Sequence, residues 1–355
     1  MQNPDIKENK ANRGRGACQN PSGRFEEFST SPVLEEDIEQ SSVKTQIFKE
    51  FSKTILSSND SPDIGMEATL NPYRGCEHGC IYCYARPNHE YMGLSAGLDF
   101  ETKIFVKENA PELLRKKLES KNWVPKTITL SGVTDCYQPL EKSLEITRGC
   151  LRVLAAFRNP VLIITKNYLV TRDLDYLSEL AKFNAISVKL SITTLDRHLA
   201  RKMEPRTSTP ERRLEAVSLL SKAGIPTGIM IGPVIPGLTD HEIPSILKAS
   251  SEAGASSAHY TMLRLPYGVK DLFQAWLQEH YPDRAERVLN RVREVRGGKL
   301  YNSEFGTRMT GTGIYADHVA QMMDLYKRKY GLTKRTELSA RSFRNPYKVQ
   351  MDLFG

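Results

Sequence analysis

The chain has 355 residues, of which 39% are hydrophobic and 26% charged, which is the composition of an ordinary globular protein. Six cysteines are too few for a disulfide scaffold, and no apolar run approaches the ~20 residues of a membrane span. The polar first residues also lack the apolar stretch of a secretory signal. We therefore expect a cytoplasmic protein without membrane contact, folded as one large domain.

The net charge of +8 is concentrated toward the C-terminus. From Lys270 onward, 16 Lys and Arg stand against 10 Asp and Glu, which accounts for +6 of the total. A basic region favours a polyanionic partner such as nucleic acid. A solvated basic helix surface explains the same charge equally well, so both interpretations stay open.

Residues 1–60 are expected to form a loosely ordered N-terminal segment. They include the run N-R-G-R-G-A-C at 12–18, then N-P-S-G, then an acidic patch at 35–37, and this composition buries little apolar surface. The Arg-Gly run could contact a phosphate backbone, but we favour a mobile tail.

Further along, short runs rich in Val, Ile, Leu and Thr alternate with amphipathic runs. Thr209 and Pro210 form a helix start, and Gly224 is suited to a helix end. The predicted strands are 68–71, 127–133, 161–166, 186–193, 227–234 and 257–263. The predicted helices among them are 111–120, 147–157, 172–182, 210–223 and 240–253.

From the second strand on, the strands recur about every 30 residues, the length of one βα unit. The series predicts an α/β fold, a partial (β/α)6 TIM-like barrel over residues 61–268. A basic helical C-terminal region follows over 269–355, with helices at 269–295 and 315–330. In such barrels the chemistry lies at the C-terminal ends of the strands.

The gap after the first strand is longer and holds an aromatic, Gly-rich insertion at 89–107. This insertion either covers the site or contacts substrate, or it is a structural loop with a short strand at 103–107.

Cys76, Cys80 and Cys83 lie in N-P-Y-R-G-C-E-H-G-C-I-Y-C-Y-A-R-P, residues 71–87, with C-x3-C-x2-C spacing. Three thiolates on one tight loop can bind three irons of a four-iron cluster. Because no fourth cysteine lies nearby, one iron is left open for a cofactor or substrate.

Zinc is the alternative interpretation of these cysteines. His78, between the first two cysteines, or His89 downstream could complete a Cys3His set. Zinc loops more often pair two C-x2-C hooks, and the sequence has no second hook. We therefore favour the cluster.

With Tyr82 directly before the last cysteine, the loop resembles the signature of the radical SAM superfamily. The resemblance implies a barrel of the radical SAM type in which the three cysteines hold a [4Fe-4S] cluster and Tyr82 belongs to the cofactor-binding loop. The open iron then chelates S-adenosylmethionine (SAM). An electron from a donor such as flavodoxin or ferredoxin cleaves SAM to a 5′-deoxyadenosyl radical.

The wider pattern is similar to one branch of that superfamily, the spore photoproduct lyase-related proteins, often labelled DNA repair photolyases. The likeness rests on the cysteine loop, on G-L-D-F-E at 97–101 and on L-S-G-V-T-D-x-Y-Q-P-L-E at 130–141. It runs from the N-terminal R-G-R-G-A to about residue 330 and says much less about substrate than about family.

The branch resemblance assigns cofactor-binding roles to further residues. Lys166, in I-I-T-K-N, matches a strand-end Lys that contacts the SAM carboxylate, and Ser191 matches a Ser that binds the SAM ribose or carboxylate. Asp135 follows the second strand, where many relatives carry a Gly-Gly-Glu-like turn for the SAM amino group. This chain has S-G-V there, so Asp135 contacts SAM, caps the next helix or touches substrate, and Glu141 has the same ambiguity.

Cys136 is a candidate hydrogen donor, because spore photoproduct lyases use a cysteine from the corresponding loop. Its offset from Asp135 does not obviously match, so we favour a buried spectator thiol. Other polar residues at or after strand ends are Arg206, His241, Arg264 and Tyr267.

We therefore expect a radical SAM enzyme, a lyase if it follows the branch, that abstracts hydrogen from a substrate the sequence does not identify. A nucleic-acid lesion or modified base fits the lyase likeness and the basic C-terminus. One alternative is a radical SAM enzyme that acts on a protein or small molecule. The other is a non-catalytic, metal-stabilised nucleic-acid-binding protein.

Overall fold

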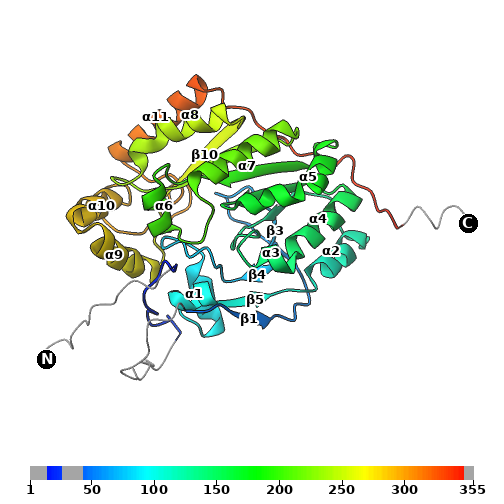
Figure 1. The fold of residues 1–355 in the computed structure, drawn as a ribbon, viewed down its shortest axis with the longest axis horizontal. Helices are drawn as coiled ribbons and strands as arrows, with labels where there is room; N and C mark the ends of the chain where they lie inside the picture. The colour runs from blue at the N-terminus through cyan, green and yellow to red at the C-terminus, as the bar shows by residue number, and fades with distance from the viewer. Residues whose placement is uncertain (1–13, 26–42, 348–355) are drawn as a thin grey trace, which may run out of the picture.

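The computed structural model describes residues 14–25 and 43–347, which are built around a sheet of seven strands (Figure 1). The sheet order is β10-β9-β8-β7-β6-β3-β2, parallel throughout except for the β2–β3 pair at one edge. Because β10 and β2 are the two edges, the sheet forms an incomplete barrel. The strands are β2 (Leu56–Ser58), β3 (Ala68–Leu70), β6 (Ile128–Leu130), β7 (Val161–Thr165), β8 (Ile186–Ser191), β9 (Thr227–Val234) and β10 (Ser257–Met262).

The six predicted strands are therefore confirmed, with ends that differ by three residues at most. Successive side chains of a strand point to opposite faces of the sheet, which gives each strand the sequence pattern used to predict it. In β8, Ile186, Val188 and Leu190 are fully buried in the main apolar core, whereas Ser191 on the other face lines a cavity. The α/β fold class and the partial barrel follow from this sheet.

Helices cover the outer face of the sheet, and α11 packs on α8 and β10 (Figure 1). Of the residues described, none belongs to a helix long and apolar enough to cross a membrane. The main helices are α2 (Ala110–Glu119), α4 (Ile146–Phe157), α5 (Leu174–Ala181), α7 (Pro210–Lys222), α8 (Ile243–Glu252) and α11 (Ile314–Lys329). Shorter ones are α1 (Leu98–Thr102), α3 (Glu141–Leu144), α6 (Arg197–Met203) and the 3-10 turns η1 (Arg86–Met92), η2 (Tyr168–Asp173) and η3 (Asp240–Glu242).

The single helix predicted at 269–295 is wrong, because the chain forms two helices there. These are α9 (Val269–His280) and α10 (Pro282–Glu294), separated by Tyr281, whose backbone is not helical. Pro282 has no N–H and its ring blocks a continuing helix, but it is well suited to the first turn of a new one. The apolar pattern continues across the break because both helices contribute to the same second core.

A second, three-stranded sheet carries the cysteine loop. It has the order β1-β5-β4, with β1 (Gln46–Lys49) parallel and β4 (Tyr73–Arg74) antiparallel to β5 (Lys103–Val106). The strand expected at 103–107 is thus β5, and β4 leads directly into the first cysteine. Figure 1 shows this sheet beside α1 and away from α8 and α11.

The described part of the N-terminal segment is more ordered than expected, while residues 1–13 and 26–42 lie outside the described residues. Arg15, in the Arg-Gly run, is 8% exposed and donates to the backbone oxygens of Glu101 at 2.8 Å and Val43 at 2.7 Å. The backbone N–H groups of Gly16 and Ala17 donate to the Glu101 carboxylate, both at 2.9 Å. Composition cannot reveal this anchor because the partner lies more than 80 residues away.

Glu101 also forms a buried ion pair with Arg86, directly after the cysteine loop. Both side chains are fully buried, and Arg86 Nη2 lies 2.5 Å from Glu101 Oε1. The rest of the guanidinium donates to the backbone oxygens of Cys80, Ala96 and Gly97. This pair therefore ties the N-terminal segment, α1 and the cysteine loop together.

We expect Glu101→Ala to lower the free energy of unfolding by about 3–5 kcal/mol, because it leaves the Arg86 charge buried without a counterion. Urea denaturation measures this loss. The matched control is Glu215→Ala in the exposed Arg212 pair, which should cost less than about 1 kcal/mol. Equal losses in the two variants would contradict the central role of Glu101.

Candidate functional site

A cavity of about 460 Å³ lies at the C-terminal ends of the parallel strands. The thiols of Cys76, Cys80 and Cys83 all line it, together with Lys166 after β7 and Ser191 at the end of β8. The fold thus brings the predicted metal ligands and two predicted cofactor-binding residues to one cavity. Tyr82 and Asp135 line it as well.

Backbone bonds and glycines give the cysteine loop its tight turn. Cys76 N–H donates to Phe100 O at 2.9 Å, and Ile81 N–H donates to Met203 O at 3.0 Å. Gly79 has φ +65°, and a Cβ there would lie 2.7 Å from Glu101 Oε2. A side chain at Gly79 would therefore collide with the buried carboxylate that holds the loop.

The donor set fits an iron-sulfur cluster. Three thiols face one cavity, and burial raises the pKa of Cys80 and of Cys83, which keeps both thiols neutral until a positively charged group is present. Within the described residues, no three His, Cys, Asp or Glu side chains converge to hold a single metal ion. Three thiols on one short loop match the ligand set that a four-iron cluster with one open iron requires.

The two histidines considered for zinc have other partners. His78 Nδ1 lies 3.4 Å from the Asp135 carboxylate and its Nε2 lies 3.2 Å from Asn167 Nδ2. His89 Nε2 lies 2.9 Å from Lys103 O and its ring packs edge-on against Phe100. The cluster therefore remains the better interpretation of the loop.

Asp135 and His78 form a buried pair at the cavity wall. Burial lowers the pKa of His78, but the Asp135 carboxylate and the Cys76 sulfur outweigh it and raise that pKa to about 10. Burial raises the pKa of Asp135, and the charge of His78 more than reverses this shift. Asp135 also accepts from Thr165 Oγ1 and from the Lys166 N–H, both at 2.8 Å, so its carboxylate bridges the ends of β6 and β7.

Lys166 presents an ammonium group to the cavity. Its Nζ donates to Gly232 O at 3.2 Å, and no described carboxylate lies within ion-pair distance of it. Gly232 O is a neutral acceptor, so the charge of Lys166 stays available for an anionic group of a ligand.

Tyr82 leads to a buried carboxylate that the sequence analysis missed. Its hydroxyl donates to Glu204, which also accepts from Thr193 Oγ1 at 2.7 Å and from Arg213. Burial raises the pKa of Glu204, although Arg213 opposes the shift. Arg213 donates in turn to Ser191 O at 2.9 Å, so this network positions the end of β8. Residue type at 204 and 213 carried no signal for the network.

Cys136 and Glu141 lie away from the cavity. Cys136 is fully buried in the main core and is absent from the described cavity lining. Glu141 is fully buried and accepts from Tyr73, from Arg172 and from the N–H of Thr147 at the start of α4. Glu141 thus has a structural role in connecting the cysteine loop to α4.

We expect His89 to make the protein sensitive to acid. Burial lowers the pKa of this ring to about 4 from its ordinary 6.5. Between these values the unfolded chain binds a proton that the folded protein excludes, so the free energy of unfolding falls as the pH drops from 6.5 toward 4. The loss reaches about 3 kcal/mol.

Chemical denaturation from pH 7 to pH 4 measures the effect. His89→Gln keeps a donor for Lys103 O but does not titrate, so the variant should show the shallower decline. If the free energy of unfolding fell equally with pH in the two proteins, the His89 ring would bind its proton as readily in the folded state as in the unfolded chain, which would contradict the prediction.

The Radical SAM superfamily pattern matches residues 70–249. An uncharacterised Mycobacterium bovis protein is 36% identical over 229 residues, which cover 64% of this chain and 66%, just under two thirds, of that relative. An uncharacterised Methanocaldococcus jannaschii protein is 29% identical over 249 residues, 70% of this chain and 89% of the relative. A Pseudomonas phage M6 protein named radical SAM Nalpha-GlyT isomerase is 27% identical over 180 residues, 50% of this chain and 35% of that protein.

Among solved structures, spore photoproduct lyase complexed with dinucleoside spore photoproduct has the same fold. Its TM-score is 0.57 at 16% identity, and the match covers 80% of this chain and 79% of the lyase. The superfamily match extends over half of the chain and includes the three cysteines, Lys166 and Ser191. The chain belongs to the radical SAM superfamily.

Proposed function

We propose that the protein is an enzyme that binds a [4Fe-4S] cluster and SAM in the strand-end cavity and abstracts hydrogen from a nucleic-acid lesion or modified base. The observation that carries this proposal is the single cavity that Cys76, Cys80, Cys83, Lys166 and Ser191 share. A cluster held by the three cysteines would supply an electron, drawn from a donor such as flavodoxin or ferredoxin, for the reductive cleavage of SAM to a 5′-deoxyadenosyl radical.

The chain's own residues bind and orient the reactants. The three cysteines hold the cluster, and Lys166 supplies a positive charge for the SAM carboxylate. Ser191 lies at the end of β8, where Arg213 holds the backbone, and would bind the ribose or carboxylate of SAM. Tyr82, fixed by Glu204, forms part of the wall, and Lys166 Nζ lies 5.9 Å from its ring centre.

Two lines of support favour a nucleic-acid substrate over a protein or small molecule. The structural neighbour with the same fold was solved with dinucleoside spore photoproduct. The excess of basic residues after Lys270 also suits a polyanionic partner. A non-catalytic nucleic-acid-binding protein does not need a cation such as Lys166 beside three cavity thiols.

We expect Cys76→Ala, Cys80→Ala and Cys83→Ala each to abolish cluster binding. After anaerobic reconstitution, the unchanged protein should carry about four irons and absorb near ~400 nm, whereas the variants should fall close to zero iron. With dithionite and SAM, only the unchanged protein should form 5′-deoxyadenosine. Cys136→Ala is the matched control, because its buried thiol lies off the cavity and should keep both the iron and the activity.

Two results would overturn this assignment. Iron and sulfide retained in all three cysteine variants would remove the cluster from this loop. One zinc per chain, bound without any 5′-deoxyadenosine formation, would support the non-catalytic alternative.

We expect Lys166→Gln to weaken SAM binding about tenfold or more, because a charge-assisted bond to the carboxylate is lost. Equilibrium binding of SAM to the reconstituted protein measures the change, with iron content checked in parallel. Lys248→Gln removes the same charge from the exposed side of α8 and should bind SAM normally. Unchanged SAM affinity in the Lys166 variant would exclude the carboxylate contact.

A further inference from the structure

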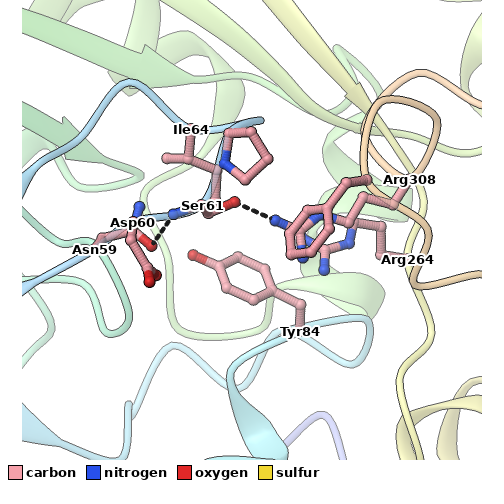
Figure 2. Close-up of a pocket in the computed structure, with 9 residues that line it drawn as sticks. Asn59, Asp60, Ser61, Ile64, Tyr84, Arg264 and Arg308 are labelled. Carbon is pink, nitrogen blue, oxygen red and sulfur yellow. Dashed lines mark hydrogen bonds between the residues drawn. The ribbon is translucent and has the colours of Figure 1, made fainter.

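A second cavity of about 430 Å³ lies beside the first, and Figure 2 shows residues that line it. Asn59, Ile64, Tyr84 and Arg264 line both cavities, so the two spaces adjoin each other. The first cavity holds the cysteines, whereas the second has none among its described lining residues. The second cavity is therefore the place where a substrate would lie against the radical-generating site.

Arg264 lines both cavities, and among the described residues no carboxylate lies within ion-pair distance of it, although Asp63 is close enough to interact with its charge. Arg264 Nη1 donates only to Met309 Sδ, at 3.5 Å, and its Nε is buried with no partner among the described residues. An unpartnered buried N–H of a charged group is costly unless a ligand completes it. Arg264 therefore points to an anionic group that binds at the junction.

The other charged residues of the second cavity do not compete with Arg264 for an anionic ligand. Arg308 is engaged, since its Nε lies 2.5 Å from Asp63 Oδ2 and its Nη2 donates to Ser61. Asp60 also lines the cavity, but Figure 2 shows it on the far side of the Tyr84 ring from Arg264. An anion beside Arg264 therefore does not have to displace an existing ion pair.

Two exposed aromatic rings line the second cavity. The Tyr84 ring centre lies 5.6 Å from the guanidinium carbon of Arg264, and the Phe305 ring centre lies 4.3 Å from that of Arg308. Tyr84 is 47% exposed, and its hydroxyl donates to Gly132 O at 2.8 Å, which holds the ring in place. Phe305 is 58% exposed, so part of its ring surface is open to a ligand. A cation next to exposed rings is the arrangement that binds single-stranded nucleic acid, by phosphate pairing and base stacking.

The loop that carries Phe305 is anchored in advance. Arg296 is 2% exposed and donates to Leu263 O at 2.7 Å and to Arg308 O at 2.8 Å. It thus ties the loop to the chain segment that bears Arg264. Because this binding surface is formed without ligand, less ordering is needed when a substrate binds.

We infer that Arg264 binds a backbone phosphate of a single-stranded or flipped-out nucleic-acid substrate, while a base of that strand stacks on Phe305. This inference rests on the proposed nucleic-acid substrate and assigns its binding position. It makes Arg264 a specificity residue for substrates that carry a phosphodiester next to the reacting nucleotide.

The test compares two fluorescent probes on the reconstituted full chain, hexathymidylate and the same sequence with an uncharged methylphosphonate backbone. Arg264→Gln should weaken binding of the phosphodiester probe about tenfold or more and leave affinity for the methylphosphonate probe nearly unchanged. For the phosphodiester probe, the slope of log affinity against log salt concentration should be smaller by about 1 in this variant. Arg264→Lys should restore part of the affinity, and Arg152→Gln, on the exposed side of α4, should bind both probes normally.

Phe305→Leu separates stacking from charge. This variant should bind both probes more weakly, by the same factor, because stacking does not depend on backbone charge. Unchanged binding of both probes would overturn the stacking part of the inference. Thermal unfolding of each variant confirms that a loss of affinity does not come from a loss of fold.

Several outcomes would overturn the phosphate site. These are normal binding by Arg264→Gln, an equal loss for both probes, no binding of hexathymidylate by the unchanged protein, or Arg264-dependent binding of hexaglutamate instead. The proposed chemistry fails separately. If the protein binds the probe through Arg264 but never forms 5′-deoxyadenosine, the phosphate site stands and the radical mechanism is contradicted. If it forms 5′-deoxyadenosine but does not bind the probe through Arg264, only the phosphate site is contradicted.

Discussion

The buried ion pair between Arg86 and Glu101 is the constraint on which the cysteine loop depends. An unpaired charge in this dry environment would be strongly unfavourable, so each side chain requires the other. Glu101 also receives two N–H groups from the N-terminal segment, and Arg86 donates to Cys80 O. One carboxylate therefore holds three chain segments against each other, and the thiols inherit their positions from it.

Near the cysteines the acidic side chains are paired with basic ones, whereas two basic side chains around the cavities have no carboxylate partner among the described residues. Asp135 is paired with His78, and Glu204, behind Tyr82, is paired with Arg213. Lys166 and Arg264 lack a described carboxylate partner. A cavity with this balance attracts anionic groups, which suits a SAM carboxylate at one end and a phosphate at the other.

Much of the fold was predictable because its signals are local. Val161 to Thr165 alternates between two faces of the sheet, and Thr209 with Pro210 starts α7 as expected. The prediction failed where distant contacts decide. β1 forms only because β5 offers it an edge, and Arg15 is ordered by Glu101. The break at Pro282 was readable in principle, but a continuous apolar pattern on both sides concealed it.

The sequence by itself determined the cysteine spacing, the βα repeat and, through them, the superfamily, because each depends on residues close together in the chain. Tertiary structure alone decided that Glu204 supports Tyr82, that Glu141 is structural and Cys136 lies in the core, and that Arg264 has no ion-pair partner among the described residues. Each of these properties depends on contacts with residues from distant segments of the chain. A guanidinium is free or paired according to what the fold packs against it, and the order of residues along the chain does not contain that information locally.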